Sequence, residues 1–297
     1  MTIPSIRSVS IAKWAICIFF IIVIVIWGII SSLPDGLLHV KFIDVGQGDA
    51  ILVTTPEGSN ILIDGGPSPQ SLCLALGKEL PFWERKLDLV IATQPHSDHI
   101  SGLVEIIKRY DINKVMDNGI SYDSEIYREW TRTIHDLDIG HLIARSNNKI
   151  ELDNGIMLEI LNPTLEALFE NSSSDVDNNG IVLKLSWKEI SFLLTADIRT
   201  EAEYKLIKDR HNLSSSVLKI AHHGSDTSTS TNFINAVNPS AAVVSVGEDN
   251  TYGHPSESVI NRINSVNPSH QLFRTDMDGS VEFITDGERL WVSTWKS

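Results

Sequence analysis

Residues 93–102, TQPHSDHISG, hold the densest set of side chains able to do chemistry. They lie between an apolar, strand-like run and a stretch with helical spacing, so His96, Asp98 and His99 belong to a strand-to-helix loop. Imidazoles and a carboxylate at this spacing are typical of a metal site, because several ligand atoms can reach one ion. Gln94 stands where such a site would be expected to have a further histidine.

Other potential ligands follow strand-like segments elsewhere in the chain. The ends of strands at one edge of a sheet converge in space, so these side chains can join the loop in a single site. Neighbouring strand residues point to opposite faces, and only one of two adjacent histidines needs to take part. The side chains concerned are Asp64, Asp197, His222, His223 and His254.

The elements that would position these residues are mainly strands, with helices between them. This order predicts two sheets packed together and covered by helices, in one domain over residues 36–297. A hydrophobic content of 42% is ample for its core. A polar stretch at 171–180 is expected to be a loop. Strands are predicted at 38–44, 50–54, 60–64, 87–92, 156–161, 180–187, 190–195, 217–221, 241–246, 271–275, 279–285 and 289–294, and helices at 70–80, 103–110, 121–137, 229–237 and 256–265.

The N-terminal region has a different character. Residues 14–34 contain no charge, and about 20 such residues cross the roughly 30 Å hydrocarbon layer of a lipid bilayer as a helix. A single transmembrane anchor is therefore predicted; a cleaved secretory signal is the alternative, which the lack of a small-residue cleavage site disfavours. Arg7 and Lys13 precede the span and Asp35 follows it, which predicts that residues 1–13 are a cytoplasmic tail and that the domain lies outside the cell membrane.

The charge balance restricts the substrates. The chain has 24 basic and 38 acidic residues, a net charge of −14. Such a field repels phosphate chains and offers no basic patch for tracking nucleic acid. A polyanionic substrate would need metal ions to reverse the local charge. Composition therefore disfavours long DNA and leaves open a smaller phosphoester, or a wall or lipid phosphodiester at the membrane surface.

Several motifs together resemble the metallo-β-lactamase superfamily. Its signature is H-x-H-x-D-H after a strand, preceded by an aspartate and followed by an aspartate and a histidine at later strand ends. More narrowly, the chain is similar to the lactamase-type domain of the ComEC family of bacterial DNA-uptake (competence) proteins. The motifs that carry this are FIDVGQGDAILV, LIDGG, QPHSDH, LLTAD, LKIAHHGSDTSTS, NTYGHPS and FRTDMDGS.

The resemblance implies a fold of mixed α/β class, the four-layer αββα sandwich of that superfamily. Members of the ComEC family carry a long multi-helix channel region before this domain, whereas here one span is predicted. The chain is accordingly expected not to be the DNA pore itself.

The resemblance also implies a divalent metal, zinc or manganese. One position would be firm, and the other would retain His96 and Asp197, with Gln94 and Asn178-Asn179 in place of two histidines. An amide oxygen is a weak, hard donor, so the second position should prefer Mn²⁺ over Zn²⁺ or bind only with the help of substrate. The firm position would have Asp98, His99, Asp197 and His222 as ligands.

The resemblance implies that Asp64 supports the ligand loop through hydrogen bonds. Asp44 and Asp49, in DVGQGD, are expected to border the same cleft, with a glycine-rich hairpin turn without function as the alternative. Asp197 would also orient the attacking water, and His223 or His254 would protonate the leaving group or bind the substrate. The expected function is metal-dependent hydrolysis of a phosphodiester, as in a nuclease. A non-catalytic binding module with a degenerate metal site is the alternative.

Overall fold

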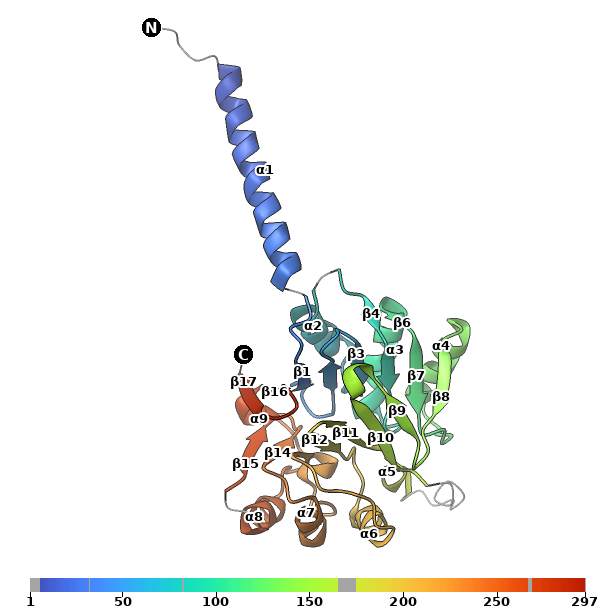
Figure 1. The fold of residues 1–297 in the computed structure, drawn as a ribbon. Coiled ribbons are helices and arrows are strands. Elements are labelled where there is room, and N and C mark those ends of the chain that lie inside the picture. The colour runs from blue at the N-terminus through green and yellow to red at the C-terminus, as the bar shows by residue number, and fades with distance from the viewer. Residues whose placement is uncertain (1–5, 32, 82, 165–174, 267–268, 297) are drawn as a thin grey trace. The chain divides into compact units, whose positions relative to one another are not determined.

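The chain forms two separate units in a computed structural model that describes residues 6–31, 33–81, 83–164, 175–266 and 269–296 (Figure 1). The boundary between the units falls between Asp35 and Gly36. The first unit contains the helix α1 (Ile6–Ser31), whose side chains from residue 13 to residue 26 are exposed. Counting only residues whose placement is described, no helix is both long and apolar enough to cross a membrane. The anchor at residues 14–34 stays a prediction.

Eight strands form the first sheet of the second unit. Their side chains alternate between two layers, since Ile51 and Val53 contact the core between the sheets while Leu52 contacts the helices. The C-terminal strands extend this sheet beside the first strand, with Phe42 opposite Val281. The order across the sheet is β17 (Leu290–Trp295), β16 (Ser280–Thr285), β1 (Leu38–Phe42), β2 (Ile51–Thr54), β3 (Asn60–Ile63), β5 (Leu89–Ile91), β7 (Lys114–Asp117) and β8 (Gly140–Ile143).

Seven strands form the second sheet. In the second sheet, β12 to β15 are parallel to one another, as are β3, β5, β7 and β8 in the first sheet. Each sheet therefore has an edge where neighbouring parallel strands end together. The order in the second sheet is β15 (Gln271–Arg274), β14 (Ala241–Val244), β13 (Val217–Lys219), β12 (Ile190–Leu194), β11 (Val182–Trp187), β10 (Met157–Asn162) and β9 (Lys149–Glu151). The short strands β4 (Lys86–Leu87) and β6 (Asp111–Ile112) pair separately.

Helices cover the outer face of each sheet (Figure 1). On α3, Ile100, Leu103, Val104 and Ile107 form one buried stripe at helical spacing, which packs against the first sheet. The layer order is therefore helix, sheet, sheet, helix, as the sequence predicts. The first sheet is covered by α2 (Pro69–Glu79), α3 (Ser97–Arg109) and α4 (Glu125–Asp136), and the second by α6 (Thr200–Lys208), α7 (Thr231–Val237) and α8 (Glu257–Val266).

Some elements are absent from the sequence prediction. Strand β7 has two buried apolar residues, Val115 and Met116, and the only buried apolar residues of the nine-residue α6 are Ala202 and Leu206, so neither element has a periodic signal of useful length. The helix predicted at 121–137 begins only at Glu125, because Ser124 caps it by accepting a hydrogen bond from the Tyr127 amide. The polar loop expected at 171–180 lies partly outside the described residues, and its described part contains α5 (Asp175–Asn178).

Candidate metal centre

The candidate site lies where parallel strands of both sheets end. Asp64 follows β3 and the loop at 92–96 follows β5 in the first sheet. Asp197 follows β12, the paired histidines follow β13 and Ser245 follows β14 in the second. Short loops at the carboxyl ends of parallel strands thus bring together side chains that are far apart in the sequence.

Backbone hydrogen bonds from neighbouring loops fix the first turn of α3. The Gly65 amide donates to the His99 carbonyl at 2.7 Å, and the Asp49 amide donates to the Asp98 carbonyl at 3.2 Å. A Cβ atom at Gly102 would lie 1.9 Å from the Gly65 carbonyl oxygen, so this close approach requires glycine. The contacts hold the side chains of Asp98 and His99 in one orientation.

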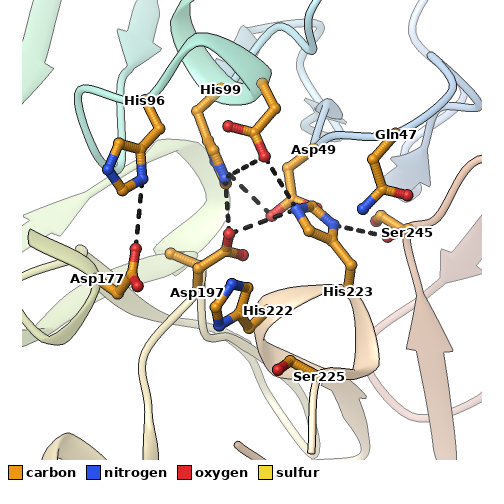
Figure 2. A network of polar contacts seen from close by, with 12 residues as sticks. Gln47, Asp49, His96, His99, Asp177, Asp197, His222, His223, Ser225 and Ser245 are labelled. Atoms are coloured by element: carbon orange, nitrogen blue, oxygen red, sulfur yellow. Dashed lines mark hydrogen bonds and ion pairs between the residues drawn. The ribbon is translucent and has the colours of Figure 1, made fainter. Parts of the chain in front are cut away.

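Four side chains converge on one point. Asp98, His99, Asp197 and His223 each offer a ligand atom, and these atoms lie within 4.8 Å of one another. His99 Nε2 is 3.1 Å from Asp197 Oδ2. His223 Nε2 is 3.4 Å from the same oxygen and 3.4 Å from Asp98 Oδ2. Figure 2 shows both imidazoles next to the Asp197 carboxylate, each joined to it by a dashed line.

The second nitrogen of each imidazole has a fixed partner. His99 Nδ1 is 2.8 Å from Asp64 Oδ2, and His223 Nδ1 is 2.8 Å from the Ser245 carbonyl oxygen. Asp64 is itself held by the Thr93 amide and hydroxyl, at 2.8 and 2.6 Å. With Nδ1–H donating to these acceptors, each neutral imidazole directs the lone pair of Nε2 at Asp197.

This donor set fits a divalent cation. Among the described residues, Asp197 Oδ1 and His223 Nε2 are buried without a hydrogen-bond partner, which is costly unless an ion binds there. Two imidazole nitrogens and two carboxylates suit zinc and manganese alike. A divalent metal site is thus supported by the structure, and the identity of the metal stays a prediction.

Electrostatics point the same way. Burial by itself would raise the pKa of Asp197, but His223 and His99 hold that pKa well below its ordinary value. Burial would lower the pKa of His223, but Asp197 and Asp98 raise it to about 10. The buried carboxylates therefore attract positive charge strongly, and a metal ion would compete with protons for the two imidazoles.

The structure assigns the paired histidines differently from the sequence prediction. His223, not His222, lies in the four-residue cluster. Both residues have positive φ angles, 52° and 53°, in the short 3₁₀ turn Ala221–Gly224, so the alternation of a strand does not apply to them. The His222 ring borders the cluster instead, 6.4 Å from His223 and 6.0 Å from His254 between ring centroids.

His96 also lies outside the four-residue cluster. Its Nδ1 is 3.3 Å from Asp177 Oδ1 (Figure 2). Its ring makes a T-shaped contact with the ring of Tyr122, with centroids 5.3 Å apart. Asp177 is held in turn by Arg199, whose Nε and Nη2 donate to Oδ2 at 2.9 and 2.6 Å. The expectation that only the amides of Asn178 and Asn179 are available beside His96 is wrong, because a carboxylate is present.

Gln94 reaches the cluster as an amide donor. Its Nε2 donates to Asp197 Oδ2 at 3.1 Å, and its buried Oε1 has no hydrogen-bond partner among the described residues. A histidine at this position would offer a nitrogen ligand, whereas the amide uses one of the oxygens on which the imidazoles converge. The Gln94 side chain thus contacts the same oxygen of Asp197 as the two imidazoles of the cluster.

The remaining predicted residues lie around this centre. Asp49 is buried, with its Oδ1 3.6 Å from His223 Nδ1. His254 is half-buried and stacks on the exposed Tyr252. Asp44 is exposed and accepts a hydrogen bond from the Gly46 amide, a turn contact outside the cluster.

Sequence reasoning missed two charged residues of the site, Asp177 and Lys219. Asp177 lies in a polar stretch without periodicity, where nothing separates it from its neighbours. Lys219 is buried within the apolar run 217–221, and a charged residue inside such a run was the available signal.

The chain is similar to known proteins along most of its length. Residues 43–167 match the model of the metallo-beta-lactamase superfamily. Competence protein ComA of Neisseria gonorrhoeae is 29% identical over 93% of this chain and 36% of its own length. ComE operon protein 3 of Bacillus subtilis is 26% identical over 90% of this chain and 35% of its own length. The chain thus spans about a third of the length of these curated relatives.

A solved structure shares the fold. Igni18, a metallo hydrolase from the archaeon Ignicoccus hospitalis, superimposes with a TM-score of 0.53 at 17% identity, covering 87% of this chain and all of Igni18. The chain is thus similar to the metallo-β-lactamase superfamily over residues 43–167 and to bacterial competence-type proteins over most of its length.

Proposed function

We propose that the chain is a metal-dependent hydrolase that cleaves phosphodiester bonds. The observation that carries the proposal is the convergence of Asp98, His99, Asp197 and His223 on one point, with buried ligand atoms that lack partners. A divalent ion bound there supplies Lewis acidity and lowers the pKa of water. The protein contributes a rigid set of ligands whose orientation is fixed by Asp64 and Ser245.

The side chains around the ligands have distinct tasks in this proposal. Asp197 Oδ1, which accepts no hydrogen bond from the described residues and lies 3.9 Å from the Lys219 ammonium, orients the attacking water by accepting a hydrogen bond from it. Because His223 lies among the ligands, we assign protonation of the leaving group to His254, whose ring lies beside that of His222. Burial, followed by the charge of His223, lowers the pKa of His254, which makes its imidazole a better proton donor once charged.

The substrate class rests on the relatives and on charge. One of the relatives, ComA of Neisseria gonorrhoeae, is named as a competence protein, which favours DNA as the phosphodiester. The net charge of −14 disfavours a long polyanion held at many contacts, so we propose that the site takes a short single-stranded segment or another small phosphodiester. Metal ions at the site would offset the negative field locally.

Metal analysis coupled to a substrate screen tests this function. The purified chain is expected to retain about one divalent ion after dialysis. It should then hydrolyse bis(p-nitrophenyl) phosphate or a short oligonucleotide with Mn²⁺ or Zn²⁺. A chain that binds neither ion and cleaves neither substrate would contradict the proposal.

A non-catalytic binding module is the second candidate. The hydrogen bond from Gln94 to Asp197 favours it, because the amide occupies an oxygen that would otherwise face an ion. Such a module would bind short phosphodiesters without cleaving them and would hold no metal tightly. The same metal analysis therefore distinguishes the two candidates.

Substitution of Gln94 by histidine is expected to strengthen a second metal position. An imidazole suits Zn²⁺ better than an amide does, and the substitution also frees Asp197 Oδ2 from the Gln94 hydrogen bond. We expect a second Zn²⁺ to bind with low affinity, a gain of roughly tenfold over the parent. Zinc titration of both proteins measures this, with Gln70→His on the surface of α2 as the control. An unchanged zinc stoichiometry and affinity would contradict the prediction.

We further propose that residues 14–34 anchor the protein in the cell membrane as a single span, with the domain outside the cytoplasm. The exposed apolar side chains along α1, among them Trp14, Phe19 and Ile24, support this, since water is a poor solvent for them. A reporter enzyme that is active only outside the cytoplasm, fused after Ser297, is expected to be active in cells. If a reporter that is active only in the cytoplasm is active at the same position, and the first reporter is inactive, the predicted orientation is wrong.

A further inference from the structure

A buried lysine lies beside the candidate metal centre. Lys219 is the last residue of β13, and only 1% of its side chain is exposed. Its ammonium group is 2.5 Å from Asp49 Oδ2, 3.1 Å from the Ala196 carbonyl oxygen and 3.9 Å from Asp197 Oδ1. A buried ammonium requires such partners, because an isolated charge in the interior is very costly.

Asp49 depends on this lysine. Its carboxylate is buried and, apart from the close ion pair of Oδ2 with the Lys219 ammonium, has no hydrogen-bond partner among the described residues. The imidazoles of His223 and His99 are farther away, with Nδ1 atoms at 3.6 and 3.9 Å. Lys219 therefore supplies the nearest positive charge to Asp49 and stands between that carboxylate and Asp197.

The charges around the metal centre determine how many divalent ions it can hold beside Lys219. The carboxylates of Asp49, Asp64, Asp98 and Asp197 all lie within contact distance of His99 or His223. With neutral imidazoles, the lysine and one divalent ion together leave a single negative charge. A second divalent ion would make the group positive, so the lysine opposes its binding by direct repulsion.

We propose that Lys219 is a built-in cation of the metal centre, which orients Asp49 and Asp197 and supplies charge that a second metal ion would otherwise bring. This inference rests on the proposed metal-dependent function. Lys219 is a positioning residue, since its ammonium contacts the carboxylates of Asp49 and Asp197 and does not contact the substrate. Together with Gln94, it makes the centre a one-metal site.

Metal titration of the metal-free protein tests the role of the lysine. In Lys219→Met, loss of the ammonium removes a repulsive charge and leaves Asp49 unpaired, so Mn²⁺ should bind at least about tenfold more tightly than to the parent, or as a second ion. In Asp49→Asn, the lysine keeps its charge and faces Asp197 alone, so Mn²⁺ should bind at least about tenfold more weakly. Lys219→Arg, which keeps the charge, should remain near the parent.

A matched control is available in the same sheet. Lys184 on β11 is also buried, but its ammonium donates to the carbonyl oxygens of Asn212 and Ser214, away from the carboxylates. Lys184→Met should leave the affinity for Mn²⁺ unchanged. Calorimetry gives the affinities, and electron paramagnetic resonance of free Mn²⁺ counts the bound ions independently of activity.

The two substitutions are expected to act in opposite directions, which a purely structural lysine would not produce. Unchanged or weaker binding in Lys219→Met overturns the inference. If that variant does not fold without metal, the comparison is made between Asp49→Asn and the Asp49→Asn/Lys219→Met pair, in which the added substitution should again tighten binding. Parent protein that binds no metal would contradict the proposed function instead, so the two failures are distinguishable.

Discussion

Replacing Asp197 with asparagine is expected to abolish metal binding and any hydrolytic activity. One carboxylate oxygen of Asp197 lies 3.1 Å from His99 Nε2 and 3.4 Å from His223 Nε2, so both imidazoles converge on it. Asparagine removes its charge and can place an amide donor where a lone pair is needed. We expect the affinity for Mn²⁺ or Zn²⁺ to fall on the order of 100-fold or more.

Equilibrium dialysis with metal analysis measures this effect, with Asp117→Asn as the control. Asp117 is likewise a buried aspartate at the end of a strand, paired with His141 Nε2 at 2.9 Å and Trp130 Nε1 at 3.2 Å, but it lies outside the cluster. The control should lose some stability and keep its metal. If the metal affinity of the Asp197→Asn variant is within about threefold of that of the parent, Asp197 is not a ligand of the metal.

Substitution of Asp98 by alanine is expected to lower metal affinity far more than substitution of His96. Asp98 Oδ2 lies 3.4 Å from His223 Nε2, in the group with converging ligand atoms, whereas His96 pairs with Asp177 outside it. Loss of the Asp98 carboxylate also leaves the charge of the ion less compensated. We expect a loss of about 10 to 100-fold for Asp98→Ala and of about threefold or less for His96→Ala.

The two variants are compared by the same titration, and Asp177→Asn serves as a further control for His96. If His96 acts only through Asp177, the His96→Ala and Asp177→Asn variants should bind metal alike. Equal losses in Asp98→Ala and His96→Ala would instead indicate two equivalent metal positions, as in a complete two-metal centre.

Much of the fold follows from patterns of neighbouring residues. Short apolar runs such as 51–54 and 60–63, bounded by turn residues, mark strands that are buried on both faces, and the stripe on α3 marks a helix on the outer face of a sheet. Strands without enough residues to display a period, such as β7, were missed for that reason. Motifs at strand ends were sufficient to select Asp64, Asp98, His99 and Asp197, because strand ends on one edge must meet.

The sequence alone determined that these side chains gather and that a histidine is missing at Gln94. Only the tertiary structure decided which of two adjacent histidines faces the cluster, because positive φ angles in a tight turn break the alternation on which sequence reasoning depends. It also decided that Asp177 lies beside His96 and that Lys219 lies between Asp49 and Asp197. Such pairings join segments that are distant in the chain, and no local pattern records which charges the folded core brings within contact.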